Sequence, residues 1–254
     1  MDTEEVNRRA WDGEEEKGNW WTLITDEESI RKAREGKPEL RITTSRPVPP
    51  SWYTLLKGKK VLSLCAGGGQ QTPVLAAYGA LVTSLDISPR QIEQDRKALS
   101  LYSLEAETVV GSVLSLPFGE SSFDAVVNPI SLNFVEDIDR AYDEIARVLR
   151  SGGTFMTGIA NPVLYLFDEK KQERKLKVKY TLPFSATVSL SKKERERRIR
   201  KGDTLEFSHT LEKIIGGMLK RGFVLEDFFS DRALSEPTDS YISDAFLALL
   251  FHKT

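Results

Sequence analysis

The sequence predicts an α/β fold: a doubly wound sheet of seven strands, mostly parallel with an antiparallel C-terminal edge, preceded by a helical N-terminal extension. From residue 59 onward, short apolar runs alternate with helical patterns, which is typical of a parallel sheet with helices on both faces. A pair of apolar runs, 224–229 and 245–251, closes the chain and indicates the antiparallel edge. Right-handed crossovers then require the doubly wound topology.

Two strand–helix units begin the sheet. Residues 61–65 form an apolar run that predicts a buried strand, and Thr72 is the expected N-cap of the helix that follows. That helix should end at Gly79, because glycine readily adopts the left-handed conformation that closes helices. Residues 81–85 predict the second strand. Ser88, followed by proline, then caps the second helix.

The second half of the sheet follows the same alternation. Short apolar runs predict strands at 107–110, 123–127 and 154–159. Between the last two, apolar residues recur at helical spacing over 138–149, and Gly152-Gly153 is the expected stop of that helix. The sheet is therefore expected to contain five successive parallel strands before its antiparallel edge.

The chain divides into two expected parts. Residues 1–55 are expected to form a helical extension or lid, with twelve acidic against seven basic side chains in the first forty residues. Residues 56–254 form the main domain, interrupted by an insertion at about 161–206. Within it, residues 168–201 carry thirteen Lys or Arg against five Asp or Glu. Such a run is usually a solvated helix face with internal ion pairs, and the alternative is a surface for an anionic acceptor such as RNA.

Composition narrows the function classes. The formal net charge of −2 gives no overall basic field, so nucleic acid is not the expected partner. Cys65 is the single cysteine, which excludes an intrachain disulfide and a four-cysteine zinc site, and we expect no metal. No run approaches the ~20 apolar residues that cross a bilayer, and the N-terminus lacks a signal-peptide pattern. We expect a cytoplasmic protein without a membrane partner.

A glycine turn carries the strongest functional signal. The first strand runs directly into residues 66–70, Ala-Gly-Gly-Gly-Gln, and doubly wound sheets bind ligands at this crevice. The alternative is a tight turn without a ligand. Asp86 ends the next strand, where a carboxylate can accept hydrogen bonds from both hydroxyls of a ribose. Thr72 stands where the nicotinamide-binding fingerprint Gly-x-Gly-x-x-Gly needs glycine, which argues against an oxidoreductase.

Further motifs follow in order at 111–113, 116–118, 122–126, 128–130 and 149–153. With the glycine turn and Asp86, the stretch 58–160 resembles a class I S-adenosylmethionine-dependent methyltransferase, Rossmann-like and of the methyltransferase type 11-like branch that acts on small molecules. The resemblance implies S-adenosyl-L-methionine as cofactor. It assigns cofactor contacts to Cys65, Ala66, Gly67, Gly68, Gly69, Gln70, Asp86, Ile87, Gly111, Ser112, Val113, Asn128, Pro129 and Ile130.

Three positions depart from the family pattern. Ser63 replaces the usual acid of the first strand, Cys65 replaces its first glycine, and Ser112 replaces an acid that faces adenine. The Ser112 hydroxyl can still accept a hydrogen bond from the adenine amino group. These departures keep open a second hypothesis, a cofactor-binding but catalytically silent regulatory or partner module. An RNA methyltransferase that uses the basic insertion is a third.

The expected reaction is methyl transfer to an unidentified small-molecule acceptor, which is mostly a matter of positioning. His209 is the candidate general base, and the alternative is a packed residue at a helix start. Aromatic side chains of the extension and the insertion are candidates for the acceptor pocket, although those of the extension can equally fasten it to the domain. These candidates are Trp20, Trp21, Tyr165, Tyr180 and Phe184, and Trp11 of the extension is a further candidate to cover the cofactor or enclose an apolar acceptor.

Overall fold

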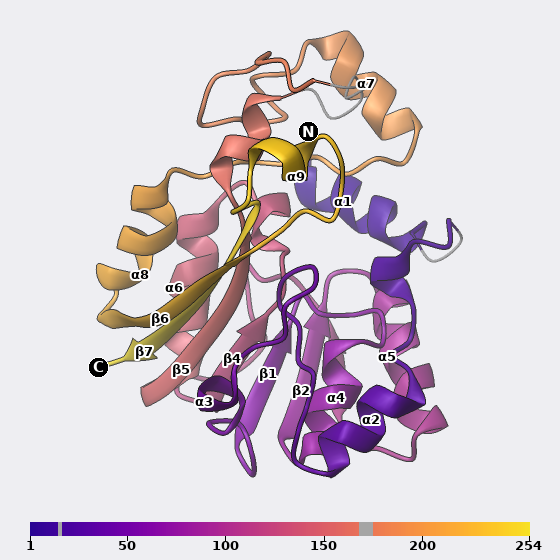
Figure 1. Ribbon diagram of the computed structural model, residues 1–254, viewed down its shortest axis with the longest axis vertical. Helices are drawn as coiled ribbons and strands as arrows, with labels where there is room; N and C mark the ends of the chain where they lie inside the picture. Colours follow the sequence, from indigo (N-terminus) through magenta and orange to yellow (C-terminus); the bar gives the residue numbers. More distant parts are fainter. Residues whose placement is uncertain (15–16, 168–174) are drawn as a thin grey trace.

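The computed structural model describes residues 1–14, 17–167 and 175–254, and it confirms the α/β fold (Figure 1). One sheet of seven strands has the order β3-β2-β1-β4-β5-β7-β6. Neighbours from β3 to β5 are parallel, whereas β7 is antiparallel to both β5 and β6. The strands are β1 (Lys60–Leu64), β2 (Leu81–Asp86), β3 (Glu107–Val110), β4 (Phe123–Asn128), β5 (Leu149–Ala160), β6 (Phe223–Asp231) and β7 (Phe246–Lys253).

Helices cover both faces of the sheet and extend beyond one end of it (Figure 1). The α-helices are α1 (Thr3–Asp12), α2 (Glu27–Arg34), α3 (Pro50–Tyr53), α4 (Gln71–Tyr78), α5 (Pro89–Leu101), α6 (Ile138–Val148), α7 (Lys192–Arg200), α8 (Gly217–Leu219) and α9 (Thr238–Tyr241). Shorter turns are the 3₁₀ helices η1 (Trp20–Thr22), η2 (Leu132–Phe134) and η3 (Pro162–Leu166), and the π-helical η5 (Glu212–Gly216). Among the described residues, none of these helices is long and apolar enough to span a bilayer.

The two faces of the sheet bury separate cores because successive strand residues point to opposite sides. Along β1, Val61 packs into one core, which includes residues of α2, α3 and α4. Leu62 and Leu64 pack into the other, which includes residues of α6 and α8. All three side chains are fully buried. This burial holds the carboxyl end of β1, and the turn that follows it, in place.

Two local expectations are wrong. The helix α4 begins at Gln71 and its N-cap is Gln70, which makes no side-chain capping bond. The Thr72 hydroxyl instead lies 2.9 Å from a carboxylate oxygen of Asp95, because burial within the fold offers it a charged acceptor. The glycine pair 152–153 lies inside β5 rather than after a helix, because α6 ends at Val148 and the chain enters the sheet at once. Gly79 and Ser88 act as expected.

The N-terminal extension is helical, and α1 lies at the end of the sheet where the parallel strands finish (Figure 1). Asn7 of α1 is 4% exposed and donates to the carbonyl oxygens of Phe134 and Leu205, at 2.9 Å each. Its amide oxygen accepts from the Leu205 backbone N–H at 2.7 Å. One side chain therefore joins α1 to the loop after β4 and to the insertion.

The described part of the insertion has a small core of its own. Phe184, Leu190 and Leu205 are buried there, and Tyr165 and Tyr180 pack against them. The basic helix α7 begins at a capping box formed by Ser191 and its third helical residue. None of the residues of α7 is buried, which agrees with a solvated helix face. Residues 168–174 of the predicted basic segment lie outside the described residues.

Candidate functional site

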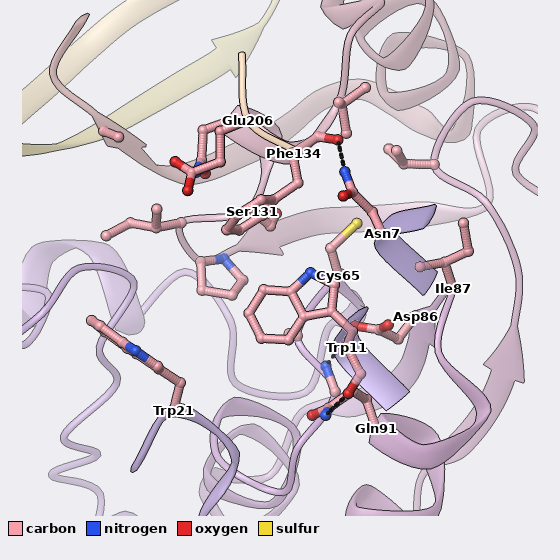
Figure 2. A pocket seen from close by; sticks show the side chains of 18 of the residues that line it. Asn7, Trp11, Trp21, Cys65, Asp86, Ile87, Gln91, Ser131, Phe134 and Glu206 are labelled. Carbon is pink, nitrogen blue, oxygen red and sulfur yellow. Dashed lines mark hydrogen bonds between the residues drawn. The ribbon is translucent and has the colours of Figure 1, made fainter. Parts of the chain in front are cut away.

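A cavity of about 720 Å³ lies at the carboxyl ends of the parallel strands (Figure 2). Its walls come from the turn after β1, the end of β2, the loops after β3 and β4, helix α1 and the segment 41–44. In Figure 2, Asp86 and Ile87 lie on one side of the cavity, and Trp21 and Glu206 lie on the other. The predicted site residues that line it are Trp21, Cys65, Ala66, Gly67, Gln70, Asp86, Ile87, Val113, Pro129, Ile130 and Tyr165.

Asp86 places a carboxylate in the wall of this cavity. Its side-chain oxygens accept from the backbone N–H groups of Ser88 at 2.9 Å and Gly67 at 3.2 Å. Burial raises the pKa of Asp86 to about 6, and these two backbone donors only partly oppose that rise. With the Ile87 backbone N–H, which also lowers this pKa, these donors still leave an acceptor position on a carboxylate that can accept about four hydrogen bonds.

The glycine turn is shaped by packing as well as by space for a ligand. A Cβ on Gly67 would lie 2.6 Å from the Cβ of Gln91, so only glycine fits between β1 and α5. Gly68 and Gly69 adopt positive φ angles of 113° and 80° and do not line the cavity. Gly69 instead accepts a hydrogen bond from the Thr25 N–H at 2.9 Å. The turn therefore also anchors the N-terminal extension.

Asp95 is a buried carboxylate that sequence reasoning missed. It accepts from the Gly69 backbone N–H at 2.8 Å, the Thr72 hydroxyl at 2.9 Å and the Ser84 hydroxyl at 2.5 Å. Burial raises its pKa to about 7. Asp95 therefore holds the glycine turn from the buried side. It lies close to Ser63, the residue that replaces the usual acid, because the Thr72 hydroxyl also lies 3.1 Å from the Ser63 hydroxyl oxygen. The sequence signal that could have identified Asp95 was its position three residues after Ile92, on the inner face of α5.

Cys65 has a positive φ of 49°, a conformation that favours glycine, which agrees with glycine being usual at this position. Burial and the nearby Asp86 carboxylate raise the pKa of its thiol, so the thiol stays protonated at neutral pH. Cys65 is thus a neutral wall of the cavity and not an activated nucleophile.

Three predicted cofactor contacts lie behind the cavity wall. The Gly111 N–H donates to the Asp86 carbonyl at 2.9 Å, which joins the ends of β3 and β2. Asn128 is fully buried and its amide donates to the Leu64 carbonyl at 2.9 Å, which joins β4 to β1. The Ser112 hydroxyl donates to the Glu4 carboxylate and accepts from the Leu114 N–H at 3.0 Å.

The candidate base and part of the candidate acceptor pocket also lie elsewhere. His209 is buried, its Nε2 lies 2.9 Å from the Val135 carbonyl oxygen, and desolvation lowers its pKa. It does not line the cavity. Tyr180 and Phe184 pack together in the insertion core with ring centroids 4.9 Å apart, also outside the cavity lining. The side chain of Trp20 lies outside the described part of the chain.

Helix α1 supplies a wall of the cavity, of which the sequence singled out only Trp11. Glu4, Asn7 and Trp11 all line the cavity. The Trp11 ring meets Phe134 edge-on at 5.2 Å between centroids (Figure 2). The Trp11 carbonyl oxygen accepts from the Gln91 side chain at 2.9 Å, which fastens the end of α1 to α5. The acidic helical pattern of α1 predicted a helix but not the face that it presents to the sheet.

A cavity at the carboxyl ends of the parallel strands, beside a carboxylate that ends β2, is where doubly wound sheets bind ligands that contain a nucleoside. Residues 62–157 match the model of the methyltransferase domain family. The chain is 41% identical over 228 residues to an uncharacterized methyltransferase, YbaJ, of Bacillus subtilis (strain 168), which covers 89% of each chain. It is 36% identical over 113 residues to the demethylmenaquinone methyltransferase of Clavibacter sepedonicus, which covers 44% of each.

Solved structures agree on the fold. An S-adenosylmethionine-dependent methyltransferase from Mesorhizobium loti matches with a TM-score of 0.62 at 17% identity, over 80% of this chain and 97% of that one. A second such protein, from Listeria monocytogenes, also has a TM-score of 0.62 at 17% identity, over 89% and 96%. The chain therefore belongs to the S-adenosylmethionine-dependent methyltransferase family and is an enzyme with that cofactor.

Proposed function

We propose that this enzyme transfers the methyl group of S-adenosylmethionine to a small-molecule acceptor inside the cavity beneath α1. The observation that carries the proposal is the cavity itself, whose volume of about 720 Å³ lies within the range of about 300–1,000 Å³ typical of small-molecule sites. Residues of α1 and of the insertion contribute to its wall, so a small acceptor fits this site better than a duplex or a folded protein.

The residues present fit the cofactor. Asp86 offers acceptor positions for the ribose hydroxyls, and Ile87 and Val113 offer apolar surface for the base. The turn residues Ala66 and Gly67 border the same space. When bound, S-adenosylmethionine supplies an electrophilic methyl group on a sulfonium. The chain's own task is to orient the acceptor against that methyl group and to exclude water.

The charge of the lining supports a cationic cofactor and disfavours nucleic acid. Among the residues that the structure describes, six with carboxylate side chains line the cavity against one with a guanidinium, Arg41. This acidic lining attracts a sulfonium and an ammonium group and repels a phosphate backbone. No residue of the basic helix α7 contributes to the lining among the described residues. The six acids are Asp2, Glu4, Asp86, Glu136, Asp137 and Glu206.

The residues that best fit the binding of the methyl acceptor are Asn133, Tyr165 and Glu206. All three line the cavity, and the Phe207 N–H donates to the Asn133 carbonyl at 2.7 Å, which brings the two loops together. The Glu206 carboxylate accepts from the Tyr165 hydroxyl at 2.8 Å. The Asn133 side-chain oxygen is buried and has no hydrogen-bond partner among the described residues. These acceptor groups suit a substrate that donates hydrogen bonds, such as an amine or a hydroxyl compound.

Calorimetry with S-adenosylhomocysteine tests the cofactor site, and methyl transfer from labelled S-adenosylmethionine tests the acceptor. The enzyme is incubated with a protein-free metabolite extract and, separately, with an RNA pool. We expect label in a small-molecule product, and less of it with Asn133→Leu, at unchanged affinity for S-adenosylhomocysteine. Label confined to RNA contradicts the small-molecule acceptor. Tight cofactor binding without any labelled product favours the catalytically silent module.

A further inference from the structure

Helix α1 brings a carboxylate to the end of the cofactor site that lies beyond Asp86. The ends of β2 and β3 are adjacent, because Asp86 pairs with Val110 in the sheet. Ile87 and Val113, which follow these two strands, both line the cavity. A nucleoside whose sugar is held by Asp86 can therefore lay its base against these apolar side chains. The residue that meets the edge of such a base decides which base is accepted.

Ser112 does not bind the edge of such a base. Its hydroxyl proton is donated to the Glu4 carboxylate, and its oxygen accepts from the Leu114 N–H at 3.0 Å. Ser112 does not line the cavity, whereas Glu4 does. The hydroxyl takes one acceptor position of the carboxylate and leaves others available for a ligand. The arrangement places Ser112 as a support and Glu4 as the group that faces the bound molecule.

The position of Glu4 is held by contacts on the remainder of α1. The Ser88 hydroxyl donates to the Asp12 carboxylate at 2.7 Å, and the Gln91 amide donates to the Trp11 carbonyl oxygen at 2.9 Å. Asn7 fastens the middle of the helix to two further segments. A carboxylate on a helix held at both its middle and its end is preorganised, which favours selective recognition.

We propose that Glu4 selects the base of the cofactor by accepting a hydrogen bond from the exocyclic amino group of adenine. The inference rests on the proposed cofactor site, since it needs the sugar at Asp86. A carboxylate only accepts hydrogen bonds when ionised, so it favours a base with a donor at that edge and disfavours one with a carbonyl. The N-terminal helix is thereby a part of the cofactor site and not only its cover.

The test compares S-adenosylhomocysteine with S-inosylhomocysteine, in which a carbonyl oxygen replaces the adenine amino group. Dissociation constants for both are measured by calorimetry. We expect the wild-type enzyme to prefer the adenosyl compound by about 10- to 100-fold, the range for a hydrogen bond to a charged group. Glu4→Gln should reduce that preference by about tenfold, because an amide can present either a donor or an acceptor.

Glu5→Gln is the matched control. Glu5 lies in the same first turn of α1, but its carboxylate is held by Arg8 at 2.7 Å and Arg9 at 2.6 Å and does not line the cavity. We expect its preference to equal that of the wild type. Ser112→Ala leaves the sequence of α1 intact while removing the support of Glu4, and should lower the preference severalfold.

The outcomes separate this inference from the function on which it rests. A wild-type enzyme that binds neither compound refutes the cofactor site itself. Binding of S-adenosylhomocysteine without preference over the inosyl analogue overturns the role of Glu4. So does full preference in both Glu4→Gln and Ser112→Ala. If Glu4→Gln weakens both compounds by the same factor, Glu4 only holds the helix in place and the inference fails.

Discussion

Two buried aspartates at the glycine turn have different tasks. Asp86 faces the cavity, whereas Asp95 lies beneath the turn and binds only protein donors among the described residues. Burial raises the pKa of both, to about 6 for Asp86 and about 7 for Asp95. Each carboxylate is expensive to ionise inside the fold, and its hydrogen-bond donors offset part of that cost.

Cofactor affinity should depend on pH through Asp86. Ribose hydroxyls donate to the ionised carboxylate, so binding favours loss of its proton. We expect the affinity for S-adenosylhomocysteine to be constant above pH ~7 and to fall as the pH drops below about 6, approaching about tenfold per pH unit. Asp86→Asn should bind about 10- to 100-fold more weakly at pH 7.5, with a flatter profile. Calorimetry from pH 5 to 8 measures both.

Without ligand, the free energy of unfolding depends on pH in the opposite direction to the cofactor affinity. Because folding raises the pKa of Asp86 from its ordinary value of 3.8 to about 6, the folded state holds its proton more tightly. The contribution of Asp86 to the free energy of unfolding therefore decreases as the pH rises across this interval.

One outcome would contradict the role of Asp86 in the pH dependence of cofactor affinity. An identical pH profile of cofactor affinity in the wild type and Asp86→Asn would assign the effect to another group, such as Asp95.

At the scale of elements, the segment 41–44 is pressed against β5. A Cβ on Gly158 of β5 would lie 1.8 Å from the Ile42 carbonyl oxygen, which is far inside van der Waals contact. The same carbonyl accepts from the Ile130 N–H at 3.1 Å. Both Ile42 and Ile130 line the cavity, so this close approach also sets the shape of the site.

Gly158→Ala should therefore lower the free energy of unfolding by about 3 kcal/mol or more, because the backbone must move apart. The matched control is Gly216→Ala, since a Cβ there meets only the Glu212 Cγ at 3.7 Å and the backbone is helical. The control should be neutral or more stable by up to about 1 kcal/mol. Urea unfolding measures both variants. Equal effects would show that the contact with Ile42 yields at little cost.

At the scale of the whole molecule, one carboxylate ties the N-terminal extension to the C-terminal edge of the sheet. Asp231, the last residue of β6, accepts from the backbone N–H groups of Ser45 at 2.7 Å and Arg46 at 2.9 Å. The hydroxyls of Thr43 and Ser45 donate to it as well, at 2.9 and 2.7 Å. Burial opposes ionisation, but these donors outweigh it and hold the pKa of Asp231 well below its usual range.

Asp231→Asn should lower the free energy of unfolding by about 2 kcal/mol at pH 7, since an amide replaces an ionised acceptor. A lowered pKa stabilises the fold above the unfolded-state value, so the difference from wild type should be constant above pH ~5 and shrink below pH ~4. Chemical unfolding at pH 7, 5 and 3.5 measures it. Asp244→Asn, at an exposed carboxylate, is the control and should change nothing. A difference that does not vary with pH would contradict the ionic origin.

Much of the fold was predictable because it depends on local pattern. The alternation of apolar runs located all seven strands, and Ser88 and Gly79 marked helix ends by their own conformational preferences. The expected cap at Thr72 was wrong because a carboxylate from α5, 23 residues away, competes for its hydroxyl. Of the candidate site, the turn after β1 and the end of β2 were predictable, because parallel strands bring their carboxyl ends together.

By itself, the sequence determined the order of strands and helices, the glycine turn and the carboxylate that closes β2, because periodicity and turn chemistry act over a few neighbouring residues. Only the tertiary structure decided which side chains meet across the cavity. Glu4 reaches Ser112 across 108 residues, and Asn7 reaches Leu205 across 198. Such contacts leave no local pattern, because they arise when packing of the whole chain brings distant segments into hydrogen-bond distance.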